Sequence, residues 1–251
     1  MRDPRHILIT GASSGLGAAL ALHYAGPGIR LSLHGRNLDR LSQTAKEAQN
    51  RGALVFLHQG DVCDEADMAH WVLACDDEAE IDLVIANAGL SGGTARGESA
   101  TQVARLFATN VAGVFNTIQP IVPRMKKRQR GQIALISSLA SFRGFPTAPA
   151  YCASKAAIRV YGEGLRAEMA PHAVEINVVC PGFIKTPLTD VNPFPMPLIM
   201  KVDHAARRIR RGLIANQARI AFPLPIYWVV RLVAALPQAL MDFIALRLPK
   251  K

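Results

Sequence analysis

The stretch HILITGASSGLG, residues 6–17, joins a short apolar run of strand composition to a glycine-rich turn. A segment rich in Ala and Leu follows at residues 15–25 and has the spacing of a helix. Glycines allow a tight turn and a close approach to the backbone, so amide N–H groups and the helix dipole can hold a pyrophosphate there. An ordinary strand-to-helix turn of small residues is the weaker alternative, because the turn directly follows the first strand. The residues predicted to contact phosphate are Gly11, Ser13, Ser14, Gly15 and Leu16.

Beyond this turn, β-branched apolar runs alternate with longer segments whose apolar residues are spaced by three or four. This rhythm is typical of a parallel sheet covered by helices. The strands are predicted at His6–Thr10, Ile29–His34, Ala53–His58, Leu83–Ala86, Gln132–Ser137, Glu175–Cys180 and Arg219–Phe222, and the helices near 15–25, 38–50, 64–78, 101–127, 149–170 and 203–215. We therefore predict one doubly wound α/β (Rossmann) domain over residues 1–222, with a seven-stranded parallel sheet and ligands at the carboxyl ends of its strands.

Composition narrows the class of protein. The chain has 251 residues, half of them apolar, which is enough for one large core. Its four cysteines show no CxxC spacing and its seven histidines no HExxH motif, so neither a disulfide framework nor a metal site is predicted. Residues 1–5 are short and polar, and no signal peptide is readable. A cytoplasmic location is the expectation.

The chemistry is suggested by Tyr151 and Lys155, which stand four residues apart and project from one face of a predicted helix. Reduction of a ketone needs a proton delivered to oxygen as hydride reaches carbon, and a phenol can supply it if a nearby ammonium favours the phenolate. Ser138 ends a predicted strand 13 residues before Tyr151. Together with the TGxxxGxG loop, this order and spacing resembles the short-chain dehydrogenase/reductase family.

The resemblance implies a role for each of four residues. Tyr151 is the acid/base, Ser138 polarises the substrate oxygen, and Lys155 also holds the ribose hydroxyls. Asn110, within TNVAG at 109–113, matches the residue that holds a water between the lysine and bulk solvent. Each residue alone has a purely structural explanation, but their joint order predicts an oxidoreductase that interconverts a carbonyl and a secondary alcohol. A catalytically silent, nucleotide-binding regulatory protein is the alternative from another class.

The end of the second strand decides which nicotinamide cofactor is predicted. An acidic residue there would bind the ribose hydroxyls and repel a 2′-phosphate. The sequence instead reads HGRN at 34–37, and Arg36 can pair with phosphate. NADP(H) is therefore predicted, with a solvated Arg36 and an NAD-dependent alcohol dehydrogenase as the alternative.

Further cofactor contacts follow from the resemblance alone. They are Asp61 and Val62 beside the adenine, Asn87, Ala88 and Gly89 near the sheet and the ribose, and Pro181, Gly182, Ile184 and Thr186 beside the carboxamide and the diphosphate. The family usually has Asn at the position of Ala86, a departure that concerns a structural position. The family also implies a homodimer or homotetramer.

The substrate side is less informative. Residues 188–200 are apolar and rich in proline and methionine, and we expect them to line the pocket. A lipophilic carbonyl or alcohol is the predicted substrate, although a proline-stiffened packing segment explains the composition equally well.

The chain ends in a hydrophobic, basic tail at residues 223–251, predicted as a helical extension. Its apolar runs, 226–236 and 239–248, are too short to span a bilayer. They either cover a pocket or a partner subunit or lie in a membrane interface, and we slightly favour peripheral contact with the inner face of the membrane because residues 196–251 carry +8 of the formal charge of +10. The basic clusters at 124–130 and 207–211 lack interleaved aromatic residues, so no nucleic acid is predicted as a partner. We interpret both clusters as solvated faces or phospholipid contacts.

Overall fold

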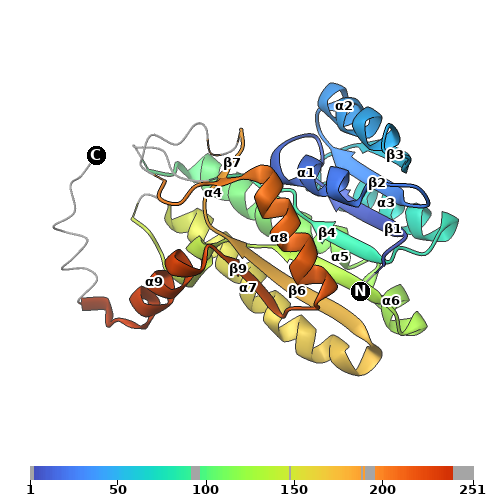
Figure 1. Ribbon diagram of the computed structural model, residues 1–251. Helices are drawn as coiled ribbons and strands as arrows, with labels where there is room; N and C mark the ends of the chain where they lie inside the picture. The colour runs from blue at the N-terminus through green and yellow to red at the C-terminus, as the bar shows by residue number, and fades with distance from the viewer. Residues whose placement is uncertain (1–2, 92–96, 147, 188, 190–195, 240–251) are drawn as a thin grey trace.

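The computed structural model describes residues 3–91, 97–146, 148–187, 189 and 196–239. Its centre is a parallel seven-stranded sheet in the order β3-β2-β1-β4-β5-β6-β9 (Figure 1). The strands are β1 (His6–Thr10), β2 (Arg30–Gly35), β3 (Leu54–Gln59), β4 (Leu83–Ala86), β5 (Gly131–Ile136), β6 (Val174–Pro181) and β9 (Arg219–Phe222). A separate two-stranded ladder pairs β7 (Ile184–Lys185) with β8 (Met200–Lys201). The predicted α/β Rossmann fold and its seven parallel strands are confirmed.

Helices cover both faces of the sheet, as Figure 1 shows. One face packs against α1 (Gly15–Tyr24), α2 (Leu38–Gln49) and α8 (Val202–Ile214). The other packs against α3 (Glu65–Glu78), α5 (Gly113–Ile118), α6 (Val122–Arg128) and α7 (Pro149–Met169). Because side chains alternate along a strand, Ile7 and Ile9 of β1 enter the first core and Leu8 enters the second, all fully buried.

The predicted single helix at 101–127 is wrong. The chain there forms α4 (Ala100–Phe107), a π-helical turn over Ala108–Ala112, α5 and, after a turn, α6. The π turn holds Asn110, which is fully buried and bonded outside its own helix, while Pro120 has no N–H to continue the helical ladder. The spacing of apolar residues continues through this break, which is why it predicts one helix.

The sheet order reverses between β1 and β4, which are neighbours although two strands follow β1 in the sequence before β4. Loops leave β1 and β4 in opposite directions at their carboxyl ends, and such a switch point is where doubly wound sheets bind ligands. The topology therefore places the glycine-rich turn and the loop after β4 side by side at the carboxyl ends of the central strands.

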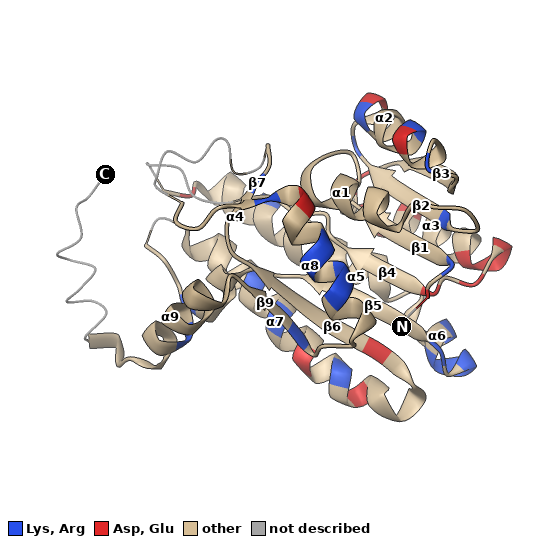
Figure 2. Ribbon diagram, viewed as in Figure 1, with Lys and Arg blue, Asp and Glu red and all other residues tan. Residues whose placement is uncertain are grey.

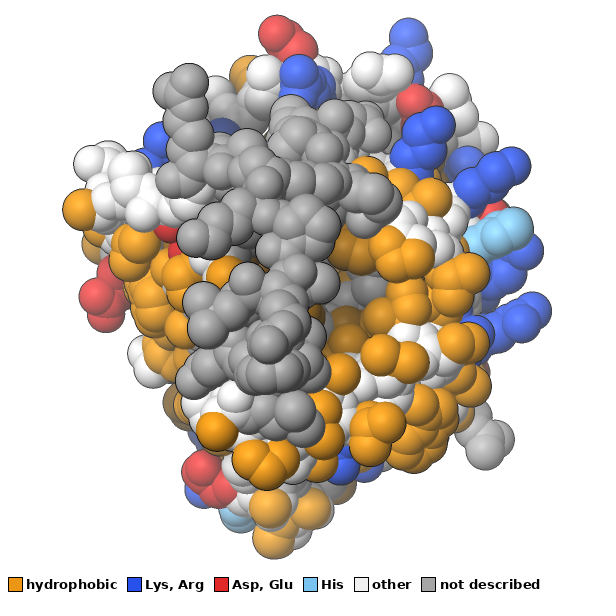
Figure 3. All heavy atoms as spheres, turned by 90° about the vertical axis from the view of Figure 1, so that its left-hand side faces the viewer, with side chains coloured by type: hydrophobic (Ala, Val, Ile, Leu, Met, Phe, Trp, Pro, Cys, Tyr) orange, Lys and Arg blue, Asp and Glu red, His pale blue; other side chains and the backbone are white. Residues whose placement is uncertain are grey.

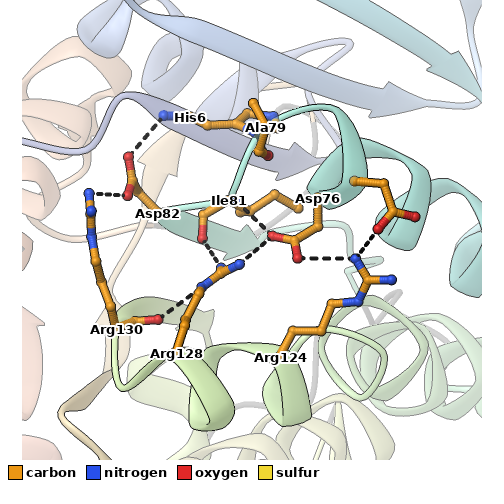
Figure 4. A network of polar contacts seen from close by, with 9 residues as sticks. His6, Asp76, Ala79, Ile81, Asp82, Arg124, Arg128 and Arg130 are labelled. Carbon is orange, nitrogen blue, oxygen red and sulfur yellow. Dashed lines mark hydrogen bonds and ion pairs between the residues drawn. The ribbon is translucent and has the colours of Figure 1, made fainter.

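At the amino-terminal ends of the strands, a network of ion pairs joins the sheet to helices α3 and α6 (Figure 4). Asp76, at the end of α3, is buried and accepts hydrogen bonds from Arg128 at 2.7 Å and from Arg124 at 3.3 Å. Asp82 accepts from Arg130 at 2.6 Å and from the amide of Arg5 at 2.6 Å. These arginines belong to the basic cluster at 124–130, which we interpreted from the sequence as a solvated face or a phospholipid contact. That interpretation is wrong for Arg128, which is largely buried against Asp76. Arg124 and Arg130, coloured with the other basic residues in Figure 2, pair with buried carboxylates while they stay partly solvated.

This network predicts a loss of stability in acid. The pKa of Asp76 is lowered by hydrogen bonds from Ile81 and Arg128, which outweigh the opposing effect of burial. Its contribution is therefore fully present above the ordinary value of 3.8 and is lost as the pH falls below it. Burial also lowers the pKa of His6 below 6.5, so stability begins to fall as the pH drops through that value, where the unfolded chain takes up the proton first.

The measurement is urea unfolding of the wild type and of Asp76→Asn between pH 8 and pH 3. We expect the variant to lose about 3 kcal/mol at pH 7, because Arg128 keeps a buried charge without its partner, and the difference to shrink below pH 4. Glu80→Gln, at an exposed acid of the same region, serves as the control. A pH-independent difference would contradict the assignment to ionised Asp76.

The tail begins with α9 (Leu224–Ala235), where the sequence predicts a helix at 226–236. It packs against β9 and the 3-10 turn η2 (Leu139–Phe142), and Arg143 donates to the carbonyl of Leu236 at 3.1 Å. The second predicted segment, 239–248, lies outside the described residues except for its first residue. Among the described helices, none has the length and apolar character to cross a membrane. The division of the chain at residue 222 stays a prediction.

Candidate active site

A cleft of about 460 Å³ opens at the carboxyl ends of the strands. Every residue that the sequence assigns to a cofactor lines it: Gly11, Ser13, Ser14, Gly15, Leu16, Arg36, Asp61, Val62, Asn87, Ala88, Gly89, Tyr151, Lys155, Pro181, Gly182, Ile184 and Thr186. Ser138 lines it as well, whereas Asn110 lies behind the wall. Residues that are far apart in the sequence thus meet around one space.

The glycine-rich turn forms one wall of the cleft at close quarters. Gly11 and Gly15 adopt positive φ angles of 67° and 56°. A Cβ atom on Gly17 would lie 2.2 Å from the carbonyl oxygen of Gly11, and one on Gly15 would lie 3.3 Å from Thr186. Glycine is required here because the turn passes so near its own helix and the opposite wall. Asn87 ties the turn to the loop after β4 by donating to the carbonyl of Thr10 at 3.0 Å.

A second wall carries positive charge. Arg36 follows β2 directly, and its guanidinium lies 3.9 Å from the Asp61 carboxylate. Arg40, one turn into α2, and Asn37, the cap of that helix, also line the cleft. Sequence reasoning missed Arg40, although its spacing of four residues from Arg36 could have indicated it. Between Gly35 and Arg40 the sequence has one acidic residue, Asp39. Asp39 is not among the described residues that line the cleft.

Ser138 and Tyr151 meet inside the cleft. The Ser138 hydroxyl caps η2 by accepting from the amide of Ala140 at 3.1 Å and donates to the carbonyl of Pro181 at 3.5 Å. It lies near enough to the Tyr151 phenol to influence the pKa of that phenol. Burial raises the pKa of that phenol, and the neighbouring Ser138 hydroxyl lowers it in part. A hydroxyl and a phenol held side by side present two proton donors to one point, which suits a carbonyl oxygen.

Lys155 lies beneath them, almost completely buried. Its ammonium donates to the carbonyl of Ile136 at 2.9 Å, and burial lowers its pKa to about 8. The acidifying effect of Lys155 on the phenol, expected from the sequence, stays a prediction, because Ser138 is the group that lowers the pKa of Tyr151 here.

Asn110 is held by three hydrogen bonds to protein partners. Its amide exchanges two hydrogen bonds with the backbone of Leu90, at 2.7 and 3.1 Å, and donates to the Ser154 hydroxyl at 3.1 Å. It lies close to Lys155, since a Cβ atom on Gly89 would be 3.1 Å from the Asn110 oxygen and 3.3 Å from the Lys155 nitrogen. The role of Asn110 in holding a water stays a prediction.

Comparison with known proteins identifies the fold's relatives. The sequence profile of short chain dehydrogenases matches residues 5–193, three quarters of the chain. The chain belongs to the short-chain dehydrogenase/reductase family. Its members are oxidoreductases that act on CH–OH and C=O groups with nicotinamide cofactors, typically on small molecules and as oligomers.

Individual members show how far the likeness extends. An uncharacterized oxidoreductase of Myxococcus xanthus is 38% identical over 97% of each chain. The structure of a short-chain dehydrogenase from Sphingobium yanoikuyae in complex with NADPH has 28% identity and a TM-score of 0.80 over 94% of this chain and 95% of its own. A member from Burkholderia phymatum in complex with NAD has a TM-score of 0.83 at 24% identity, covering 92% of this chain and 93% of its own. The family is thus shown, while NADPH and NAD both occur among its members.

The cleft of this short-chain dehydrogenase fits a dinucleotide. A Cβ atom on Gly15 would fill the space beside the glycine-rich turn, since it would lie 3.3 Å from Thr186 on the other side of the cleft. The cations of the second wall stand where the chain leaves β2, the strand next to the glycine turn. On the substrate side, Leu188 and residues 190–195 lie outside the described residues, and only Thr189 of the predicted segment 188–200 is among the described residues that line the cleft.

Proposed function

We propose that the protein is an NADP(H)-dependent oxidoreductase that interconverts a lipophilic carbonyl compound and a secondary alcohol. The observation that carries the proposal is that Ser138, Tyr151 and Lys155 line one cleft together with the glycine-rich turn, with Lys155 buried and bonded to the carbonyl of Ile136. That all three side chains which the family resemblance assigns to the reaction are present in this cleft supports an enzyme over a regulatory protein that only binds the nucleotide.

Two side chains of the protein, Ser138 and Tyr151, act on the carbonyl oxygen of the substrate. A bound nicotinamide cofactor would supply or take up the hydride at the substrate carbon. Ser138 donates a hydrogen bond to the substrate oxygen, and the Tyr151 phenol gives that oxygen its proton in reduction and takes it back in oxidation. Lys155 would hold the ribose hydroxyls with its ammonium. Burial lowers the pKa of Lys155 to about 8, and hydrogen bonds from its ammonium to the ribose hydroxyls would favour the charged form.

The preference for NADP(H) rests on the second wall. Arg36 is more than half exposed at 3.9 Å from Asp61, so it has only a loose partner and can turn to a 2′-phosphate. Arg40 adds a second cation to the same side of the cleft. A carboxylate in the place of Arg36 would favour NAD instead.

The preference for a lipophilic substrate, and for contact with a membrane surface, rests on α9. Its outward face exposes Trp228, Val229 and Leu232 by 64%, 60% and 68%, and Leu224 extends the same face one turn earlier. Figure 3 shows apolar side chains over much of this side of the molecule. No acidic residue occurs in 223–239, and Arg231 borders the apolar face, as suits the headgroups of an anionic bilayer.

The helices α4 and α7 also expose large apolar side chains, Phe107 and Val160. The family resemblance implies that subunits associate through the segments 101–127 and 149–170, to which most of these two helices belongs. We include a homodimer or homotetramer in the proposal on this ground.

The test is NADPH consumption with methyl ketones from 2-butanone to 2-dodecanone, with and without phosphatidylglycerol vesicles. We expect kcat/KM to rise with chain length by about tenfold for every two methylenes that become buried, because each contributes roughly 0.8 kcal/mol. Vesicles should shift the emission of exposed Trp228 to the blue, while buried Trp71 stays unchanged.

Phosphatidylcholine vesicles and the variant Leu232→Glu are the controls for surface contact. Turnover that ignores chain length would remove the lipophilic substrate, and a Trp emission unchanged by anionic vesicles would remove the membrane contact. Tight NADPH binding without turnover of any ketone would instead favour a regulatory role or a different carbonyl class.

A further inference from the structure

Tyr151 occupies the first turn of α7, where a helix is least secure. The helix begins at Pro149, and the residue before it, Ala148, has no side chain that can cap the free N–H groups. The first four N–H groups of any helix lack partners within it, and uncapped turns fray. The proposed acid/base thus stands on a turn that its own sequence does not secure.

Glu98 supplies the missing cap from another part of the chain. Its carboxylate accepts a hydrogen bond from the amide of Ala150 at 2.6 Å and one from the amide of Tyr151 at 3.0 Å. Pro149 has no N–H, so these are the first two donors of the helix. A carboxylate at this point also gains from the helix dipole and from charge-assisted bonds. Glu98 lies 53 residues before Tyr151, in the connection between β4 and α4.

The carbonyl side of Tyr151 is held as well. It accepts a hydrogen bond from the Ser154 hydroxyl at 2.8 Å, and that hydroxyl accepts one from Asn110 at 3.1 Å. Asn110 in turn bonds Leu90, which lies in the same connection between β4 and α4 as Glu98. Both sides of the Tyr151 backbone are therefore tied to this one connection, directly or through two side chains.

We propose that Glu98 is a positioning residue, which sets the rate of the reaction by holding the Tyr151 backbone so that the phenol meets Ser138 and the substrate oxygen. The inference rests on the proposed function, because it concerns the same phenol. Displacement of a reacting group by about 1 Å can cost on the order of 100-fold in rate. The groups that shift the pKa of the phenol are its buried surroundings, Ser138 and Cys152, so Glu98 acts through position and not through charge.

The experiment compares Glu98→Ala and Glu98→Gln with Glu168→Gln, which removes the same charge from an exposed position on α7. The substrate is the best methyl ketone of the series, and rates are normalised to bound NADPH. We expect Glu98→Ala to lower kcat at least tenfold, with the Kd for NADPH and the pH midpoint of kcat unchanged. Glu98→Gln should recover part of the rate, because its amide oxygen can still accept one of the two bonds.

Hydrogen exchange of the peptide spanning 148–155 is the second readout and needs no turnover. We expect exchange there to quicken at least tenfold in Glu98→Ala and to stay unchanged in Glu168→Gln. Unchanged exchange in Glu98→Ala, or quickened exchange with wild-type kcat, overturns the inference. If wild-type protein reduces no ketone, the proposed function fails by itself, while the exchange data still decide whether Glu98 holds this turn.

Discussion

Tyr151→Phe should lower kcat by about a thousandfold or more and leave the affinity for NADPH within about twofold of the wild type. The substitution removes only the hydroxyl beside Ser138 and keeps the ring that lines the cleft. A positioned general acid contributes about 10²- to 10⁴-fold, and no other phenol is among the described residues that line the cleft. Stopped-flow NADPH oxidation and fluorescence titration of NADPH measure the two quantities.

Tyr161→Phe is the matched control, because Tyr161 stands on the same helix and packs its ring edge-to-face against Phe115 in the second core. It should change stability slightly and kcat not at all. A Tyr151→Phe enzyme with more than a tenth of the wild-type kcat would show that the proton comes from elsewhere.

The second large effect is expected from Arg36→Asp. The exchange replaces a cation by a carboxylate beside Asp61, so a 2′-phosphate would meet two negative charges in place of one ion pair. We expect the Kd for NADPH to rise about 100-fold, roughly 2.7 kcal/mol, and the Kd for NADH to stay the same or to improve. Isothermal titration with both cofactors measures the change in preference.

Lys46→Asp controls for net charge, since it makes the same change at an exposed position late in α2. It should leave both affinities within about twofold. Equal losses for NADPH and NADH in Arg36→Asp would mean that Arg36 does not contact the 2′-phosphate, and unchanged affinities would leave Arg36 as a solvated loop residue.

The parts of this protein that the sequence predicted are those in which local chemistry decides the outcome. Glycines at 11, 15 and 17 are needed by the turn itself, and the turn lies where they indicate. The strands follow from apolar runs buried on both faces, and their parallel order follows from the alternation with helices. Tyr151 and Lys155 share a helix, so their common face is fixed by a spacing of four residues.

Only the tertiary structure decided the features that depend on partners distant in sequence. The π turn at Asn110 forms where its amide finds Leu90 and Ser154, and nothing in the local spacing of apolar residues announces it. The sequence alone suggests that the cluster at 124–130 is a solvated basic face, whereas in the structure α3 brings Asp76 to Arg128. In the sequence Glu98 belongs to no recognisable motif. It caps α7 only because the sheet order places the connection between β4 and α4 against that helix. The physical reason is the same in each case: periodicity and turn chemistry act over a few residues, whereas burial of a charge or a backbone donor is satisfied by whatever group the fold brings within about 3 Å.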